Sequence, residues 1–164
     1  RGGASARAYD QDAATVGHWH GRDYALPLTH GRTFEAAELW ENYQYFVRQA
    51  APVAEEEGVR IGIHPDDPPW SLFGLPRVVS RMPDYEALFA ANPALANGVT
   101  FCTGSLGARG DNDLAAMLRT LAPRVHFAHL RNVKRDPDGL HFWVTTRPLS
   151  SMRMQSAEFA LETS

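Results

Sequence analysis

The chain has 164 residues, of which 44% are hydrophobic and 21% charged, so it can bury a core and is not compositionally disordered. Sixteen Lys and Arg against nineteen Asp and Glu give a net charge of -3 without a basic face, so a nucleic-acid partner is not expected. With no apolar stretch near the roughly 20 residues of a membrane-spanning helix, and one cysteine, we expect a cytoplasmic chain without a membrane partner.

The first 33 residues are rich in Gly, Ala, Asp and His and show no sustained hydrophobic period. This composition predicts a loop-rich segment. The segment has no apolar core of the kind found in signal peptides, and the chain does not begin with Met. We therefore expect the N-terminus to be cut.

A long amphipathic helix is predicted to follow. From Phe34 to Ala54, apolar residues recur at steps of three and four, which is typical of one buried helical face. Thr33 is the expected N-cap, and Gly58 is expected to end the helix in the left-handed conformation. Pro52 is expected to kink it.

Short strands then alternate with helices. Runs rich in β-branched and aromatic residues predict strands at 59–64, 98–102 and 124–130. Helical periodicity predicts helices at about 84–91 and 113–121. This alternation indicates parallel strands joined by right-handed crossovers, and hence an α/β fold.

The number of βα units bears on the architecture. A barrel and an open sheet both fit the alternation, and an eight-unit barrel typically needs about 250 residues. Three clear units would make up less than half of such a barrel, so we expect a fragment. Residues 134–164 hold one apolar cluster, Leu140 to Val144, and no recognisable fourth unit.

The three predicted strands end in side chains that can bind a metal: His64, Cys102 and His129. They are 38 and 27 residues apart, about one βα unit each time. Because the carboxyl ends of parallel strands meet at one edge of the fold, these side chains are expected to converge. Imidazole and thiolate suit zinc, iron or cobalt, whereas the nearby Asp66 and Asp67 suit manganese or magnesium, so ligand type leaves the metal open.

A structural interpretation competes with this one, because a single Cys or His in a strand more often packs in the core than binds metal. Three such residues at strand ends favour a site. By strand alternation, His64 and Cys102 point away from their apolar neighbours, whereas His129 shares a face with Phe127. His126 is therefore an alternative third ligand.

Charged residues beside these strand ends are candidates for catalysis and substrate binding. Asp66 and Asp67 lie in a backbone stiffened by three prolines, which could hold carboxylates for acid or base chemistry, or form a turn with solvated acids. Arg131 and Asn132 could bind an anionic, hydroxylated substrate, or be solvated strand-end residues. The loop expected at 102–107 could carry a thiol nucleophile or cradle a phosphate, although its spacing matches neither common phosphate loop.

Four motifs in this chain occur together, and in this order, in one family. They are Ile63-His64-Pro65-Asp66-Asp67-Pro68-Pro69, Phe73-Gly74-Leu75-Pro76-Arg77, Cys102-Thr103-Gly104-Ser105-Leu106-Gly107 and His126-Phe127-Ala128-His129-Leu130-Arg131-Asn132-Val133. The chain thereby resembles mannonate dehydratase from about Trp40 to Val133.

The resemblance implies a metal-dependent (β/α)8 TIM barrel of the xylose isomerase-like kind, here partial, with about three βα units. It implies a hydro-lyase that converts D-mannonate to 2-dehydro-3-deoxy-D-gluconate in glucuronate catabolism, with Mn²⁺ or Fe²⁺ as the metal. The family's ligands fall on His64, Cys102 and His129 rather than on His126. A fourth ligand, an aspartate from a later strand, is not recognisable after Gly139.

These observations predict one incomplete barrel domain, with a loop-rich segment at 1–33, family-like units at 34–133 and a divergent tail at 134–164. The loss of pattern after Gly139 suggests a shifted reading frame or an artificial junction over 140–164. The open strand edges of a partial barrel favour self-association into a homo-oligomer. Alternative functions are a sugar isomerase of the same barrel class, an inactive remnant and a metal-binding interaction module.

Overall fold

The computed structural model describes residues 8–10, 16–19, 22–25, 32–72, 74–137 and 141–145. A parallel sheet with the strand order β4-β5-β6 forms its centre. The strands are β4 (Ile61–Ile63), β5 (Asn97–Cys102) and β6 (Val125–His129). β4 and β6 lie within the predicted runs, β5 begins one residue earlier than predicted, at Asn97, and the predicted parallel pairing is confirmed. The described part is therefore a mixed α/β structure built on a parallel sheet.

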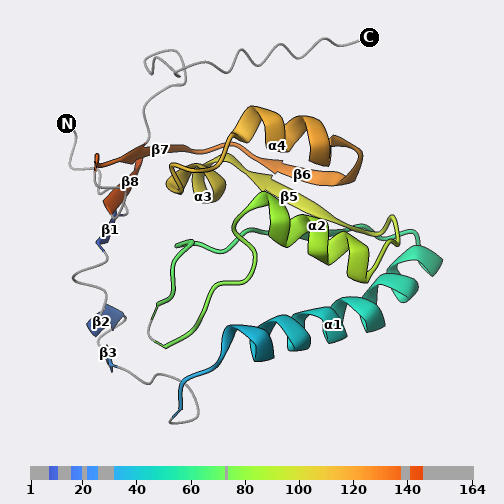
Figure 1. Ribbon diagram of the computed structural model, residues 1–164, viewed down its shortest axis with the longest axis horizontal. Coiled ribbons are helices and arrows are strands. Elements are labelled where there is room, and N and C mark those ends of the chain that lie inside the picture. The colour runs from blue at the N-terminus through green and yellow to red at the C-terminus, as the bar shows by residue number, and fades with distance from the viewer. Residues whose placement is uncertain are drawn as a thin grey trace.

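The helices run one after another along this sheet, with α1 at the bottom of the view and α4 at the top (Figure 1). They are α1 (Ala36–Glu56), α2 (Met82–Ala91), α3 (Thr103–Ala108) and α4 (Leu114–Leu121), followed by the 3₁₀ turn η1 (Ala122–Arg124). Side chains from all four helices and β5 share one core, with members such as Val47, Leu88, Phe101, Leu106 and Leu121. Burial of these apolar side chains is the main force that fixes the helices against the sheet.

The ends of helix α1 agree only in part with expectation. Gly58 has a φ of +66°, which confirms the expected left-handed end of this segment. The expected cap at Thr33 is wrong: the N-cap is Glu35, and its side chain makes no capping hydrogen bond. Pro52 lies inside α1, which continues to Glu56 as one helix. Packing of the apolar face against the core stabilises α1 without a side-chain cap.

The segment after Cys102 was expected to be a loop and instead forms helix α3, so that expectation is wrong. The residues Gly104 to Ala108 are all buried. A Cβ on Gly104 would lie 2.8 Å from Nε of Arg131, so the neighbouring chain approaches closely because the residue is small. Tertiary packing of small residues therefore produces a helix that weak local propensity does not predict.

Two further sheets involve residues near the ends of the described chain. β1 (Ala8–Asp10), β8 (His141–Thr145) and β7 (Asn132–Arg135) form an antiparallel sheet in the order β1-β8-β7. β2 (Val16–Trp19) and β3 (Arg22–Ala25) form an antiparallel pair. These strands were not predicted. Among the described helices, none is long and apolar enough to cross a membrane.

The antiparallel sheet contacts the loop that follows β4. Tyr9 of β1 stacks on Trp70, with ring centroids 5.6 Å apart and ring planes 13° apart. Phe142 of β8 contacts both rings, at centroid distances of 5.6 and 6.0 Å. This aromatic cluster joins residues near both ends of the chain to the loop that carries Asp66 and Asp67.

Candidate metal centre

The three residues expected to bind a metal come together at the carboxyl edge of the parallel sheet. His64 directly follows β4, Cys102 is the last residue of β5 and His129 is the last residue of β6. Cys102 and His129 are register partners. One potential ligand atom from each of the three side chains lies within 4.8 Å of the other two. The parallel register therefore places two imidazoles and a thiol side by side.

The donor set and its spacing fit a divalent transition-metal ion. Nδ1 of His129 lies 3.6 Å from Sγ of Cys102. Two ligands of one ion, with bonds of about 2.0 Å to nitrogen and about 2.3 Å to sulfur, lie at a similar separation of about 3–4 Å. Transition-metal ions bind imidazole and thiolate well, whereas hard ions prefer oxygen ligands.

The neighbouring backbone orients the first of these imidazoles. Nδ1 of His64 lies 2.6 Å from the carbonyl oxygen of Pro65, which can only accept a hydrogen bond. Nδ1 is therefore the donor, and Nε2 keeps its lone pair. Such a hydrogen bond to the second ring nitrogen is the usual way in which a protein orients a metal-binding histidine.

The charges around His129 favour its neutral form. Partial burial lowers the pKa of His129 below its ordinary value, and the positive charge of Arg131 and the neighbouring His64 lower it further. Asp67 acts in the opposite direction. A neutral imidazole is the form that binds metal ions, so the surroundings of His129 prepare it as a ligand.

His126, the alternative ligand, is used elsewhere. Its Nδ1 lies 3.0 Å from the carbonyl oxygen of Ile61. A Cβ on Gly98 would clash with its ring, so β5 packs directly against His126. Among the described residues, His126 does not belong to the group that could hold a metal ion. Its position supports a packing role between strands.

Asp66 anchors the proline-rich loop. Its Oδ2 accepts hydrogen bonds from the backbone N–H groups of Val78 and Val79, both at 2.8 Å. Its own N–H donates to the carbonyl oxygen of Val79 at 2.8 Å, and Arg77 lies 3.8 Å from its other oxygen. The carboxylate thus holds the start of the loop against its segment at 77–79.

Asp67 and Arg131 connect this loop to the metal-capable cluster. Nη2 of Arg131 donates to Oδ2 of Asp67 at 2.6 Å, to Oγ of Ser105 at 2.7 Å and to Sγ of Cys102 at 3.3 Å. The sequence indicated Asp67 as an acid or base candidate and Arg131 as a substrate-binding candidate without linking them. The structure shows that they form an ion pair. Asn132 begins β7, opposite Thr145.

Ser105 is a site residue that sequence reasoning missed as an individual. It is 1% exposed, and both its hydroxyl and its backbone N–H donate to the sulfur of Cys102. A Ser three residues after a Cys that ends a strand is the available signal, because this spacing suits a capping interaction. This spacing indicates a cap only if a helix follows Cys102, and the sequence predicted a loop there.

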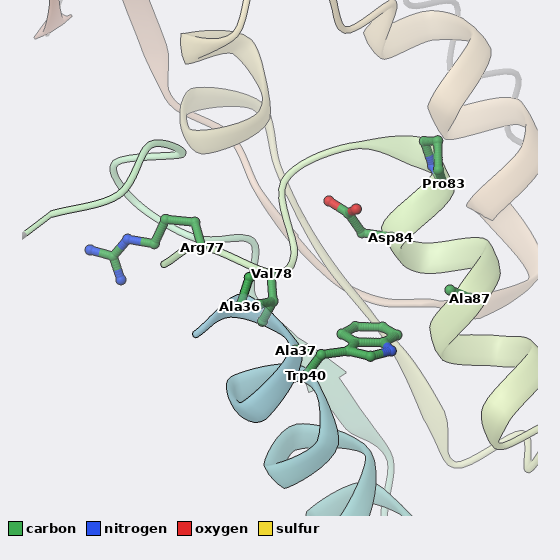
Figure 2. Close-up of a pocket in the computed structure, with 8 residues that line it drawn as sticks. All are labelled: Ala36, Ala37, Trp40, Arg77, Val78, Pro83, Asp84 and Ala87. Atoms are coloured by element: carbon green, nitrogen blue, oxygen red, sulfur yellow. The ribbon is translucent and has the colours of Figure 1, made fainter. Parts of the chain in front are cut away.

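A shallow pocket lies away from this cluster, between the start of α1 and the start of α2 (Figure 2). Its volume is about 340 Å³ and its walls are mostly apolar, with Trp40 between the two helices and Arg77 and Asp84 as the charged members. None of the three metal-capable residues lines it. The residues that could bind a metal therefore lie at the edge of the sheet and not in this pocket.

Comparison with known proteins identifies similar chains. The family described as D-mannonate dehydratase (UxuA) matches residues 25–159. A mannonate dehydratase of Brucella canis is 54% identical over 110 residues, which cover 67% of this chain and 27% of that protein. Mannonate dehydratase 2 of Agrobacterium fabrum is 48% identical over 141 residues, which cover 86% of this chain and 32% of that protein.

A solved structure is also similar. The crystal structure of mannonate dehydratase from Streptococcus suis serotype 2 aligns with a TM-score of 0.65 at 36% identity, covering 70% of this chain and 33% of that chain. The chain spans about a third or less of the length of these relatives.

Proposed function

The chain belongs to the mannonate dehydratase family, and from this premise we propose that it forms part of a hydro-lyase that converts D-mannonate to 2-dehydro-3-deoxy-D-gluconate in glucuronate catabolism. The observation that carries the proposal is the convergence of His64, Cys102 and His129, whose ligand atoms lie within 4.8 Å of one another. We propose these three residues as the metal ligands.

The parallel sheet is proposed to be one part of a (β/α)8 barrel. Its three strands alternate with helices, and the matched segments make up only 27% and 33% of the relatives' length. In such barrels, the loops at the carboxyl ends of the strands form the active site. The position of the cluster at that edge supports this assignment.

We propose Mn²⁺ or Fe²⁺ as the bound ion, in the cytoplasm. When bound, the ion supplies Lewis acidity to an oxygen on which negative charge develops. Two neutral imidazoles and one thiolate would hold it with a low total charge, and an oxygen ligand from outside the described residues could complete the coordination. The sulfur lies at the buried side of the cluster, and His64 lies at its exposed side.

The reaction is an elimination in which a proton leaves the carbon beside the carboxylate and the neighbouring hydroxyl leaves as water. The enol that results then tautomerises to the keto acid. We propose that Nη1, the terminal nitrogen of Arg131 that is not hydrogen-bonded to Asp67 and Ser105, binds the substrate carboxylate, and that the Asn132 amide binds a hydroxyl. These contacts would orient the sugar acid against the cluster.

Of the two acid or base candidates, Asp66 and Asp67, we propose Asp67 for proton transfer and Asp66 for support of the loop. Asp67 and Cys102 contact the same nitrogen of Arg131, so Asp67 lies beside the cluster, where we propose that it moves a proton of the substrate. Both oxygens of Asp66 face the loop, where two backbone donors and Arg77 surround them. Asp66 would thus hold the loop in the position that Asp67 requires.

The activity is tested by incubating the chain with D-mannonate and Mn²⁺ under reducing conditions and measuring the keto-deoxy acid. We expect product that a chelator abolishes and that Cys102→Ala does not form. A sugar isomerase would leave D-mannonate unchanged, because an aldonate has no aldehyde or ketone to exchange, and would instead convert an aldose to a ketose of the same mass. No product from folded, metal-loaded chain would contradict activity of this chain by itself.

A second arm tests the site independently of chain length. Residues 34–133 can replace the matching segment of the Brucella canis enzyme, because the two sequences are 54% identical over their matched 110 residues. We expect the chimera to be active and its Cys102→Ala variant to be inactive. A folded but inactive chimera would overturn the proposed function.

A further inference from the structure

The sulfur of Cys102 is surrounded by more hydrogen-bond donors than a buried thiol needs for packing. We propose that Ser105, oriented by Arg131, is a positioning residue that fixes this sulfur and weakens its electron donation to the bound ion, so that the site disfavours sulfur-seeking ions such as Zn²⁺. The inference rests on the proposed ligand set and goes beyond it, because it assigns a selectivity role to a residue that would not touch the metal.

Two of the donors belong to Ser105 itself. Its Oγ lies 3.2 Å from Sγ of Cys102, and its backbone nitrogen lies 3.4 Å from the same sulfur. Both residues are buried, with exposed fractions of 1% for Ser105 and 0% for Cys102. Water therefore does not compete for these contacts, and the sulfur stays in one position at the end of β5.

Arg131 determines the direction of the serine hydroxyl. Its Nη2 carries two hydrogens and has three acceptors within reach: Asp67 at 2.6 Å, Ser105 at 2.7 Å and the sulfur at 3.3 Å. The two shorter contacts take these hydrogens most directly. Because the Ser105 oxygen accepts from Arg131, its single hydrogen is free to point at the sulfur. The result is a directed chain of donors from Arg131 through Ser105 to Cys102.

The backbone of Arg131 is fixed as well. Oγ1 of Thr103 accepts from the N–H of Arg131 at 2.8 Å and donates to its carbonyl oxygen at 2.7 Å. A Cβ on Gly104 would lie 2.8 Å from Nε of Arg131, so only a glycine leaves room for the guanidinium at this point. Helix α3 thus supplies both the donor to the sulfur and the support for the residue that orients the donor.

The chemical consequence concerns the metal–sulfur bond. Hydrogen bonds to a thiolate lower the energy of its lone pairs, so the sulfur donates less charge to a metal ion. Soft or borderline ions depend on that donation more than Mn²⁺ does. Residues that hydrogen-bond a ligand commonly change metal affinity by about 10- to 100-fold. Ser105 would therefore reduce the advantage that Zn²⁺ has over Mn²⁺ at this site.

The test uses Co²⁺ as a spectroscopic probe on the full 164-residue chain, because its thiolate complex has a sulfur-to-metal charge-transfer band. Three proteins are compared: the unmodified chain, Ser105→Ala and Ser80→Ala. Ser80 is also buried, with 6% exposed, and is not a donor to the Cys102 sulfur, so it matches the change in composition and burial. Competition experiments with Mn²⁺ and Zn²⁺ give the ratio of their affinities.

We expect Ser105→Ala to move the band to longer wavelength, to lower Mn²⁺ affinity by about tenfold and to lower Zn²⁺ affinity by less. Ser80→Ala should leave the band and the ratio unchanged. Arg131→Met provides a second variant if Ser105→Ala does not fold, and should shift the band in the same direction by a smaller amount. A change in packing alone would not give a large shift in Ser105→Ala, a smaller shift in Arg131→Met and no shift in Ser80→Ala.

Two results would overturn the inference. A Ser105→Ala chain that keeps the band at its original wavelength and the original Mn²⁺ to Zn²⁺ ratio would show that Ser105 does not act on the sulfur, while leaving the ligand set intact. Absence of the band from the folded, Co²⁺-loaded unmodified chain would overturn the inference together with Cys102 as a ligand.

Discussion

Nη2 of Arg131 donates to Oδ2 of Asp67 across 2.6 Å and thereby connects the short link between β6 and β7 to the proline-rich loop after β4. The side chains are 19% and 31% exposed, so water only partly screens their attraction. In a double-mutant cycle with Asp67→Asn and Arg131→Met, we expect a coupling free energy of about 1 kcal/mol.

Chemical denaturation of the four proteins measures this coupling. The Arg32–Glu38 pair, with exposed fractions of 52% and 38%, provides a matched comparison at the surface, where water screens the charges more and a smaller coupling is expected. Equal coupling in the two pairs would contradict a structural link between the loop and the metal-capable cluster.

Removal of the proposed sulfur ligand should weaken metal binding severely. We expect Cys102→Ala to reduce Co²⁺ affinity by more than the roughly 10- to 100-fold typical of supporting residues, as measured by calorimetry. His126→Ala is the matched control, because His126 contacts Ile61 and Gly98 rather than the cluster. Unchanged affinity in Cys102→Ala, or equal losses in the two variants, would argue against the proposed ligand set.

The titration of His129 is a further expectation. Its pKa lies below the ordinary 6.5 because of partial burial, the positive charge of Arg131 and the neighbouring His64. As the pH falls below 6.5, the unfolded chain takes up this proton before the folded chain does. Any stability that depends on neutral His129 is therefore complete above pH 6.5 and declines below it.

Imidazole NMR signals of the metal-free chain measure this titration directly. Arg131→Met removes a positive charge and should raise the midpoint, whereas Asp67→Asn removes a negative charge and should lower it. Shifts in the opposite directions would mean that these charges do not face His129 as described.

Asp66 should matter for stability because of the loop it holds. Asp66→Ala leaves the N–H groups of Val78 and Val79 without their acceptor, at a cost of about 1–3 kcal/mol in the free energy of unfolding. Asp66→Asn keeps one oxygen acceptor and should recover part of this loss. Thermal or urea denaturation that finds both variants as stable as the unmodified chain would contradict this role.

Gly98 tests the close packing of β5 against its neighbour. A Cβ at this position would meet the ring of His126 and lie 2.5 Å from the carbonyl oxygen of Arg124, so Gly98→Ala is expected to cost about 1–3 kcal/mol of stability. Gly110→Ala is the control, since its nearest neighbours would lie at the ordinary distance of 3.9 Å. Similar stabilities for the two variants would mean that β5 and His126 are further apart than the structure places them.

The sequence was most informative where structure is local. The β-branched run before His64 and the periodic apolar residues of 34–54 correspond to β4 and α1, because each pattern reflects burial of one continuous segment. The convergence of His64, Cys102 and His129 was predictable from the topology of parallel strands, because each residue lies at or directly after the end of its strand.

Long-range pairing carried no comparable signal. β1 pairs with β8 through Tyr9 and Phe142, residues far apart in the chain, and neither strand has the length or alternation that marks a strand in isolation. Helix α3 was missed because its Gly, Ser and Thr residues favour turns until packing buries them. The Ser105 donors reach the sulfur of Cys102 only because α3 is helical, so the sequence alone did not predict this contact.

X-ray absorption spectroscopy of the Co²⁺-loaded chain tests the central claim most directly, because it counts the atoms bound to the metal by type. If His64, Cys102 and His129 bind one ion, the spectrum will show one sulfur at about 2.3 Å and two imidazole nitrogens at about 2.0–2.1 Å. A coordination shell made only of oxygen and nitrogen, in a folded chain that holds one ion, would contradict the claim.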